Sequence, residues 1–291
     1  MDWVVAVSDD ESAQGQIHPN RASAAYASLQ VHGCVLLRGA FAPATVEAMS
    51  AGYVAQFGAM DSAAMEDQAG KPPPNRVFRV GEARYDILLP MIGAFGRPDV
   101  FANRLLLNFL IPLLGKNLHL SSLTTVVSYP GATQQHAHRD HPDLYFEPGV
   151  SPMQPIYAVN VAVPLIDIDL ATGPTGVWLG SHRLPDGAKP QDKDLVAREF
   201  KRGDCLLLDY RTMHSGLPNR GTRARPIVYM VYARPWFFDH GNHKRRIPLD
   251  LPLESYNELP PPIRPLLSRA FSYGIYARWR EADIGAPSAQ A

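Results

Sequence analysis

Hydrophobic residues in the first part of the chain recur at the three- and four-residue spacing of amphipathic helices. Segment 43–57 shows this spacing. Segment 20–31 has small, helix-forming residues after Asn20 and stops at Gly33, and segment 99–114 is strongly apolar and begins at Asp99 as its cap. Pro43 opens segment 43–57, at a position that favours proline in a helix, and Gly115 follows segment 99–114. We therefore predict three helices here.

Two neighbouring segments break this pattern. Residues 34–37 (CVLL) form a short apolar run, which predicts a buried strand. Residues 61–75 are mostly polar and include three successive prolines, which cannot continue a helix or a sheet ladder. We predict that this segment is a loop, a candidate lid.

Beyond residue 118 the pattern changes to short β-rich runs separated by glycine- and proline-containing turns. Strands are predicted at 121–129, 156–165, 176–179, 196–200, 205–209 and 227–232. Helices followed by many short strands indicate an α+β fold around a β-sandwich or barrel. A closing helix is predicted at 260–271, and 284–291 has the composition of a flexible tail.

The composition is that of an ordinary globular protein: 291 residues, formal net charge +0 and 46% hydrophobic residues. A neutral chain gives no electrostatic reason to expect nucleic acid or an anionic membrane as partner. No apolar run reaches membrane-spanning length, and the N-terminus lacks the pattern of a signal peptide. Cys34 and Cys205 lie inside apolar runs, which is typical of buried thiols and favours a cytoplasmic protein.

Residues 133–142 read TQQHAHRDHP and concentrate metal-binding side chains. His136, His138, Asp140 and His141 fit the zinc motif of metallo-β-lactamase-like hydrolases. The glycine pair expected after that motif is missing, however, and the cluster lies almost halfway along the chain. A two-zinc hydrolase therefore stays open as the weaker alternative.

An iron site makes fewer demands on the same segment. Side chains two residues apart on an extended chain point to one side, so His138 and Asp140 could share a metal. A third ligand would complete a site of two histidines and one carboxylate. His214, which follows the predicted strand 205–209 in a polar, turn-rich setting, is our candidate.

Arg225 lies eleven residues after His214, at the head of the apolar run 226–232. If it points inward, a buried guanidinium requires an anionic partner, and a carboxylate suits its two-pronged geometry. A dicarboxylate such as 2-oxoglutarate could chelate iron at one end and pair with Arg225 at the other. The alternative is an exposed arginine at the start of a strand.

These residues together resemble the phytanoyl-CoA dioxygenase family of iron(II)/2-oxoglutarate-dependent enzymes. The resemblance covers roughly residues 33–237, and its motifs occur in the family's order: RYDILLP (84–90), SYPGATQQHAHRDH (128–141), ATGPTGVWLGSHR (171–183) and FKRGDCLLLDYRTMHSGLPNRG (200–221). It implies a double-stranded β-helix (jelly-roll or cupin-like) core with flanking N-terminal helices. We expect a single domain over 1–283, with a helical part to about 117, a β-rich core to about 240 and a C-terminal helical extension.

Site residues follow from the same resemblance. It implies that His138, Asp140 and His214 are the catalytic iron ligands and that Arg225 binds the distal carboxylate of 2-oxoglutarate. Further co-substrate contacts are implied for Gln135, Thr175 and Asn160, although a turn residue and a structural hydrogen bond explain the last two equally well. The sequence departs from some relatives at Gly216, where they carry serine or threonine, so the hydrogen-bond partner of Arg225 stays open.

The implied activity uses iron(II), 2-oxoglutarate and O2 to hydroxylate, or otherwise oxidise, a small and largely apolar metabolite, with natural-product biosynthesis as one setting. Succinate and carbon dioxide would be released. Asp140 disfavours halogenation, which in related enzymes needs a small residue at this position. A barrel that binds a small ligand without catalysis is a further alternative, and the sequence leaves a homo-oligomer open.

Overall fold

The computed structural model describes residues 2–71, 75–145, 147, 149–150, 153–185, 187–239, 242 and 247–271. Its helices are α1 (Asp9–Gln14), α2 (Pro19–His32), α3 (Pro43–Phe57), α4 (Ser62–Ala69), α5 (Pro98–Phe101), α6 (Arg104–Leu114) and α7 (Leu253–Glu258). Its strands are β1 (Val4–Ala6), β2 (Cys34–Arg38), β3 (Val77–Gly81), β4 (Arg84–Leu88), β5 (His119–Ser128), β6 (Ala158–Pro164), β7 (Thr175–Trp178), β8 (Leu195–Ala197), β9 (Cys205–Asp209), β10 (His214–Gly216) and β11 (Arg225–Ala233).

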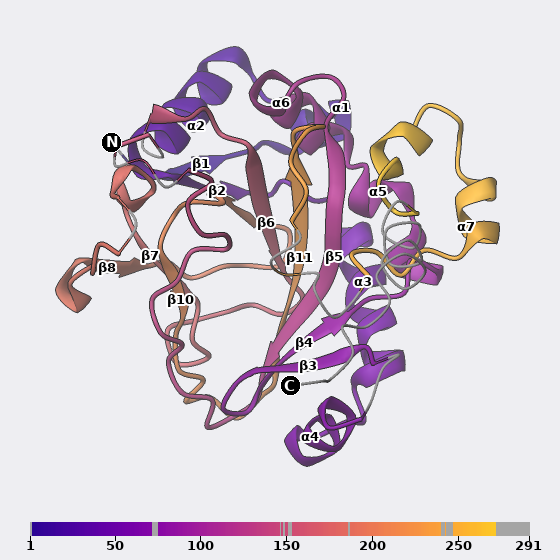
Figure 1. Ribbon diagram of the computed structural model, residues 1–291. Helices are drawn as coiled ribbons and strands as arrows, with labels where there is room; N and C mark the ends of the chain where they lie inside the picture. Colours follow the sequence, from indigo (N-terminus) through magenta and orange to yellow (C-terminus); the bar gives the residue numbers. More distant parts are fainter. Residues whose placement is uncertain are drawn as a thin grey trace, which may run out of the picture.

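Two sheets form the β structure. The larger has eight strands in the order β1-β2-β9-β6-β11-β5-β4-β3, and the smaller has three in the order β10-β7-β8. In the larger sheet β1 pairs with β2 in parallel, and the other neighbours are antiparallel. Helices and the smaller sheet lie on opposite sides of the larger sheet (Figure 1).

Alternation along the central strands gives the larger sheet two apolar faces. Residues such as Val161, Leu207 and Met230 belong to the main hydrophobic cluster, together with helix residues such as Leu29 and Phe109. The residues between them, such as Ala162, Leu206 and Leu208, form a second cluster with Val177 of β7. The chain is therefore layered as helices, large sheet and small sheet, with the second cluster between the sheets.

Several predicted elements are confirmed. The helices predicted at 20–31 and 43–57 are α2 and α3, and the strands predicted after residue 118 are β5, β6, β7, β8, β9 and β11. Gly33 ends α2 with a left-handed backbone (φ 75°), which is favourable for glycine. The α+β class is therefore confirmed.

Other predictions were wrong. Segment 61–75 is not a continuous loop, because Asp61 accepts a hydrogen bond from the Ala64 amide and begins α4. The helix predicted at 99–114 is interrupted, since Asn103 caps the new helix α6 through the Leu106 amide.

Two further differences concern the ends of the chain. The first 117 residues are not only helical, because they also supply β1 to β4. The predicted closing helix at 260–271 is only a short 3-10 helix at Arg264–Leu267, in a segment containing four prolines. The expected tail at 284–291 lies outside the described residues.

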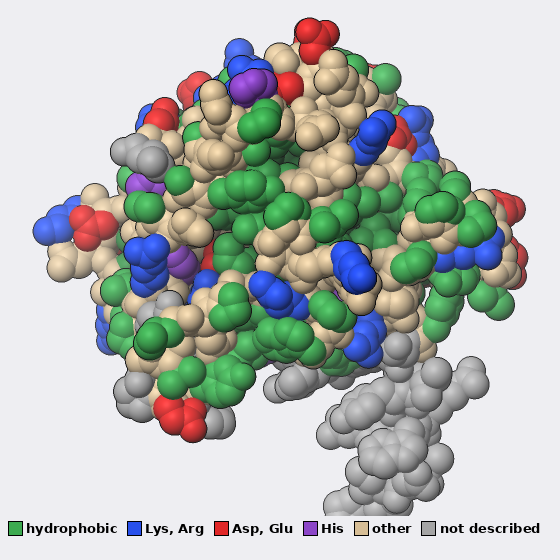
Figure 2. All heavy atoms as spheres, turned by 90° about the horizontal axis from the view of Figure 1, so that it is seen from above, with side chains coloured by type: hydrophobic (Ala, Val, Ile, Leu, Met, Phe, Trp, Pro, Cys, Tyr) green, Lys and Arg blue, Asp and Glu red, His purple; other side chains and the backbone are tan. Residues whose placement is uncertain are grey.

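No helix among the described residues combines the length and hydrophobicity needed to cross a lipid bilayer. Viewed from above, the molecule carries Lys and Arg side chains as well as Asp and Glu side chains, with hydrophobic ones between them (Figure 2). This mixture agrees with the balanced charge of the sequence.

Candidate active site

His138 and His214 are cross-strand neighbours. After β9 leaves the larger sheet, the chain crosses to the smaller sheet through a turn in which Arg211 pairs with Asp209 (2.6 Å). His214 then opens β10. Its backbone exchanges two hydrogen bonds with His138 (His138 N to His214 O, 3.1 Å; His214 N to His138 O, 2.9 Å), and the imidazole centroids lie 4.4 Å apart.

Hydrogen bonds fix which nitrogen each imidazole presents. The Nδ1 atom of His138 lies 2.9 Å from the His136 carbonyl oxygen, and that of His214 lies 3.0 Å from the Thr212 carbonyl oxygen. Because a carbonyl oxygen only accepts, each Nδ1 carries the proton and donates. Each Nε2 therefore keeps the lone pair that a metal ion requires.

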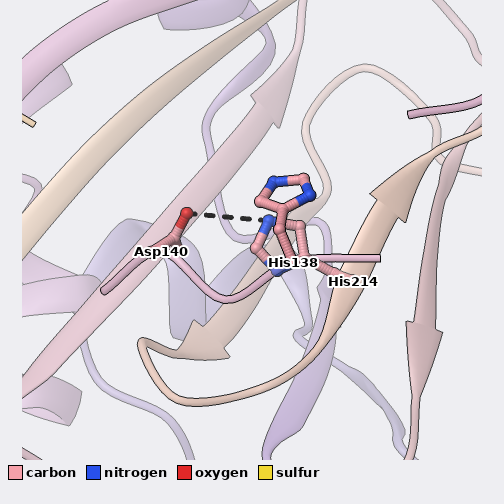
Figure 3. Close-up of side chains that lie close together, drawn as sticks. All are labelled: His138, Asp140 and His214. Carbon is pink, nitrogen blue, oxygen red and sulfur yellow. Dashed lines mark ion pairs between the residues drawn. The ribbon is translucent and has the colours of Figure 1, made fainter. Parts of the chain in front are cut away.

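Asp140 completes the group. Its Oδ1 atom lies 3.6 Å from Nε2 of His214, while its Oδ2 atom accepts a hydrogen bond from Nδ2 of Asn160 (3.0 Å). One ligand atom from each of His138, Asp140 and His214 lies within 4.8 Å of the others. The three side chains point toward one another from two separate segments of the chain (Figure 3).

Burial disfavours the charged forms of His138 and Asp140. It lowers the pKa of His138 to about 3, with His214 contributing in the same direction. It also raises the pKa of the Asp140 carboxyl. A divalent cation would stabilise a site in which a neutral His138 imidazole lies beside the Asp140 carboxylate.

The four-residue zinc cluster is not assembled. Among the described residues, the sole group of at least three candidate metal ligands is His138, Asp140 and His214. The His136 side chain is exposed, and the Nδ1 atom of His141 lies 2.8 Å from the Pro142 carbonyl oxygen while its ring packs edge-on against Phe237. The geometry therefore matches the iron hypothesis and not the hydrolase alternative.

A cavity of about 170 Å³ opens beside the three ligands. The residues around it are largely polar: Val80, Arg84, Asp86, Ser122, Thr124, Val126, Gln135, His138, Asp140, Asn160, Thr175, Tyr210, His214, Gly216, Tyr229, Val231 and Asn242. Three of the four predicted co-substrate contacts, Gln135, Thr175 and Asn160, are in this lining. Asn160 also contacts Asp140, so its amide orients a candidate ligand.

Arg225 points inward. Its side chain is 1% exposed, and Nη2 donates to the Ser128 hydroxyl (2.5 Å), which answers the question raised by Gly216. Its Nε and Nη1 atoms have no hydrogen-bond partner within the described part of the chain. Burial lowers the pKa of Arg225 from its ordinary value, so an anionic partner would stabilise this buried guanidinium and could use its free donors.

Arg84 is a second buried guanidinium, and our residue predictions missed its role. It is 1% exposed, and it lines the cavity, which Arg225 does not. Burial and the charge of Arg225 lower its pKa to about 10, so it remains a cation at neutral pH. Nη2 donates to the carbonyl oxygens of Thr133 and Leu217 (3.0 Å each). The available signal was its position: Arg84 leads β4 just as Arg225 leads β11.

Gly216 makes room for Arg84. A β-carbon at this position would overlap Nη1 of Arg84 and would lie 2.5 Å from Oε1 of Gln135. The same Oε1 atom accepts a hydrogen bond from the Gly216 amide (3.1 Å). Some relatives carry serine or threonine at this position. Here the Arg84 guanidinium occupies the space that such a side chain would need.

Known proteins resemble the chain in sequence. Residues 29–227, more than half of the chain, match the phytanoyl-CoA dioxygenase (PhyH) family. The iron/alpha-ketoglutarate-dependent dioxygenase ausU of Aspergillus calidoustus is 34% identical over 90 residues, which are 30% of this chain and 29% of that protein. The dioxygenase andF of Emericella variicolor is 32% identical over 97 residues, covering 33% and 34%. The chain thus spans about a third of the length of these curated relatives.

Solved structures share the fold at low sequence identity. The non-heme alpha-ketoglutarate-dependent epimerase SnoN from nogalamycin biosynthesis superimposes with a TM-score of 0.55 at 19% identity, covering 75% of this chain and 84% of SnoN. AviO1 from Streptomyces viridochromogenes Tue57 gives a TM-score of 0.57 at 20% identity, covering 74% and 96%. With the family match over residues 29–227, the chain belongs to the phytanoyl-CoA dioxygenase family.

Proposed function

We propose that the protein is an iron(II)- and 2-oxoglutarate-dependent oxygenase that oxidises a small molecule. The observation that carries this proposal is the convergence of His138, Asp140 and His214, with both Nδ1 protons directed away from the shared space. Two imidazoles and one carboxylate suit iron(II) and leave coordination positions open. Bound iron and 2-oxoglutarate supply oxygen activation, coupled to decarboxylation of the co-substrate to succinate.

The protein's own contribution is position and charge. His138 and His214 hold Nε2 lone pairs at fixed places because backbone carbonyls accept from their Nδ1 atoms. Asn160 holds Asp140 by one carboxylate oxygen and leaves the other toward His214. We assign these three ligands to iron, since such support orients a ligand before the metal arrives.

The two buried arginines support a dicarboxylate co-substrate. Neither Arg84 nor Arg225 forms an ion pair with a carboxylate in the described part of the chain, and Arg225 keeps two unused donors. Two buried cations close to each other are unfavourable unless an anion joins them. We assign the distal carboxylate of 2-oxoglutarate to this pair, with Gln135 and Thr175 as neighbouring polar contacts.

The proposal extends to fold and substrate. We assign the two facing sheets to a double-stranded β-helix in one domain over 1–283. The sequence predicted a small, largely apolar metabolite as substrate. Polar lining residues such as Ser122, Thr124 and Asn242 favour instead a small molecule that carries several hydrogen-bonding groups.

Oxygen consumption with iron(II), measured with and without 2-oxoglutarate and paired with succinate formation, tests the activity. We expect 2-oxoglutarate to stimulate oxygen uptake and to yield succinate. His138→Ala should abolish both, while His136→Ala, its neighbour two residues away, should retain iron binding. Loss of metal binding in His136→Ala, or no response to 2-oxoglutarate, would contradict the proposal.

A further inference from the structure

A buried carboxylate outside the candidate ligand set, Asp239, contacts two residues that line the cavity. Asp239 is 1% exposed and lies six residues after the end of β11. Its Oδ2 atom accepts a hydrogen bond from the Tyr210 hydroxyl (2.5 Å), and its Oδ1 atom accepts one from the backbone nitrogen of Asn242 (2.9 Å). The Asn242 side chain, through Nδ2, also donates to Oδ2 (2.8 Å). Both Tyr210 and Asn242 line the cavity.

These hydrogen bonds reach the segments that carry the candidate ligands. The same Nδ2 atom of Asn242 donates to the backbone carbonyl oxygen of Asp140 (2.8 Å). Tyr210 begins the turn between β9 and β10, which leads directly to His214. One carboxylate therefore joins the loop of Asp140 to the turn that delivers His214.

The amide orientation of Asn242 follows from its partners. A backbone carbonyl oxygen and a carboxylate oxygen both only accept, so the group between them must be the NH2 of the side chain. Asp239 supports this arrangement, because it holds Asn242 by side chain and backbone together. Tyr210, which donates to Asp239, also interacts with the Asn242 side chain, so these three residues form one hydrogen-bonded group.

The described donors to Asp239 are the Tyr210 hydroxyl and two nitrogen atoms of Asn242, and all three are neutral groups.

We propose that Asp239 is a positioning residue of the metal centre: through Asn242 and Tyr210 it holds the Asp140 loop and the turn before His214 in their ligand-binding arrangement. This inference rests on the proposed metal site and assigns no contact with the metal to Asp239 itself. The strand β11 then has a role at each end, with Arg225 at its start and the Asp239–Asn242 hydrogen bonds after its last residue.

The test uses the full chain and cobalt(II), a spectroscopic substitute for iron(II). Metal affinity is measured by titration calorimetry, and the visible absorption of bound cobalt(II) reports on ligand geometry. Asp239→Asn replaces an acceptor by a donor beside the Asn242 NH2, so we expect about tenfold weaker binding and an altered spectrum. Asn242→Ala, at an exposed position that should not impair folding, should also weaken binding about tenfold and alter the spectrum in the same direction.

Asp204→Asn is the matched control. Asp204 is a comparably buried carboxylate (4% exposed) that accepts backbone hydrogen bonds at the opposite end of β9. It should lower thermal stability and leave cobalt(II) affinity and spectrum unchanged. Affinities within twofold of wild type and an unchanged spectrum in both Asp239→Asn and Asn242→Ala would overturn the inference. If wild type and His138→Ala bind cobalt(II) equally, it is the proposed metal site that fails.

Discussion

Arg84 and Arg225 lie on either side of Ser128 in neighbouring strands. In the register of the larger sheet, Ser128 of β5 pairs with Arg84 of β4 on one side and with Arg225 of β11 on the other. Both guanidinium groups are buried, and the charge of Arg225 helps to lower the pKa of Arg84. This cross-strand row is the reason for our proposal that Arg84 and Arg225 bind the distal carboxylate of 2-oxoglutarate.

Removing either positive charge should weaken 2-oxoglutarate binding. A hydrogen bond to a charged group contributes about 1.5–3 kcal/mol, so Arg225→Gln and Arg84→Gln should each raise the KM for 2-oxoglutarate about 10–100-fold. Iron(II) affinity should change little, since neither residue contacts the three ligands. Oxygen uptake at varied 2-oxoglutarate concentration gives the KM.

Arg223→Gln provides the comparison, because Arg223 is an exposed arginine two residues before Arg225. The KM of the Arg223→Gln variant for 2-oxoglutarate should equal that of the wild-type protein. An unchanged KM in Arg225→Gln and Arg84→Gln would exclude the paired arginines as the carboxylate site.

Gly216→Ser should also impair the co-substrate site. The new β-carbon would meet Nη1 of Arg84 and Oε1 of Gln135, which must move together. Overpacking of this kind costs about 1–3 kcal/mol, so we expect roughly tenfold weaker 2-oxoglutarate binding with the fold retained. Calorimetry with the iron-loaded or cobalt-loaded protein measures the effect.

A double variant separates steric overlap from a general defect. Lysine is narrower than arginine at its end, so Gly216→Ser combined with Arg84→Lys should lose less affinity than the two single changes together. Strict additivity of the two free-energy changes would show that Gly216 and Arg84 do not interact.

Local signals along the chain predicted the elements that are stabilised locally. Pro43 in the first turn of α3 and Gly33 after α2 identify helix ends, and the apolar run 205–209 identifies β9. The hairpin of β3 and β4 was missed, because its turn includes Ala83 with a positive φ of 48° instead of a glycine. Helix α4 was missed because its only buried residue, Met65, is stabilised by contacts distant in sequence.

The site shows the same division. His138, Asp140 and His214 were predictable from residue type and order, and the structure brings them together. Arg84 and Asp239 were not, since an arginine or aspartate in a sequence is most often exposed. Their burial depends on strand register and on Tyr210 and Ser128, far away in the chain.

Asn160→Ala should weaken the metal site without changing its ligands. Nδ2 of Asn160 is the described donor to Oδ2 of Asp140, and its loss frees the carboxylate to rotate. Loss of such a supporting hydrogen bond lowers metal affinity about 10–100-fold. Cobalt(II) titration measures the change. Asn219→Ala removes a buried asparagine that bonds backbone carbonyls of Ser128 and Arg223 instead, and it should keep the wild-type affinity. Equal affinities in Asn160→Ala and wild type would contradict this role.

His119 should make stability depend on pH. The side chain is 1% exposed at the start of β5, and neither ring nitrogen has a hydrogen-bond partner within the described residues. Burial, followed by the charge of Arg269, lowers the pKa of His119 to about 4 from the ordinary value of 6.5. The unfolded chain therefore binds a proton more readily than the folded one. Stability is fully present above pH 6.5 and falls toward pH 4, by up to about 1.4 kcal/mol per pH unit.

Urea unfolding of wild type and His119→Leu at several values between pH 7.5 and pH 4.5 checks this expectation. Leucine cannot be protonated and leaves no buried nitrogen without a partner, so the variant should lose less stability on acidification. His138, whose pKa is also lowered, contributes the same sign in both proteins and cancels in the difference. The two stability curves should therefore diverge below pH 6.5, with the gap growing as the pH falls. Parallel curves over the whole range would mean that the His119 ring is protonated equally in the folded and the unfolded chain.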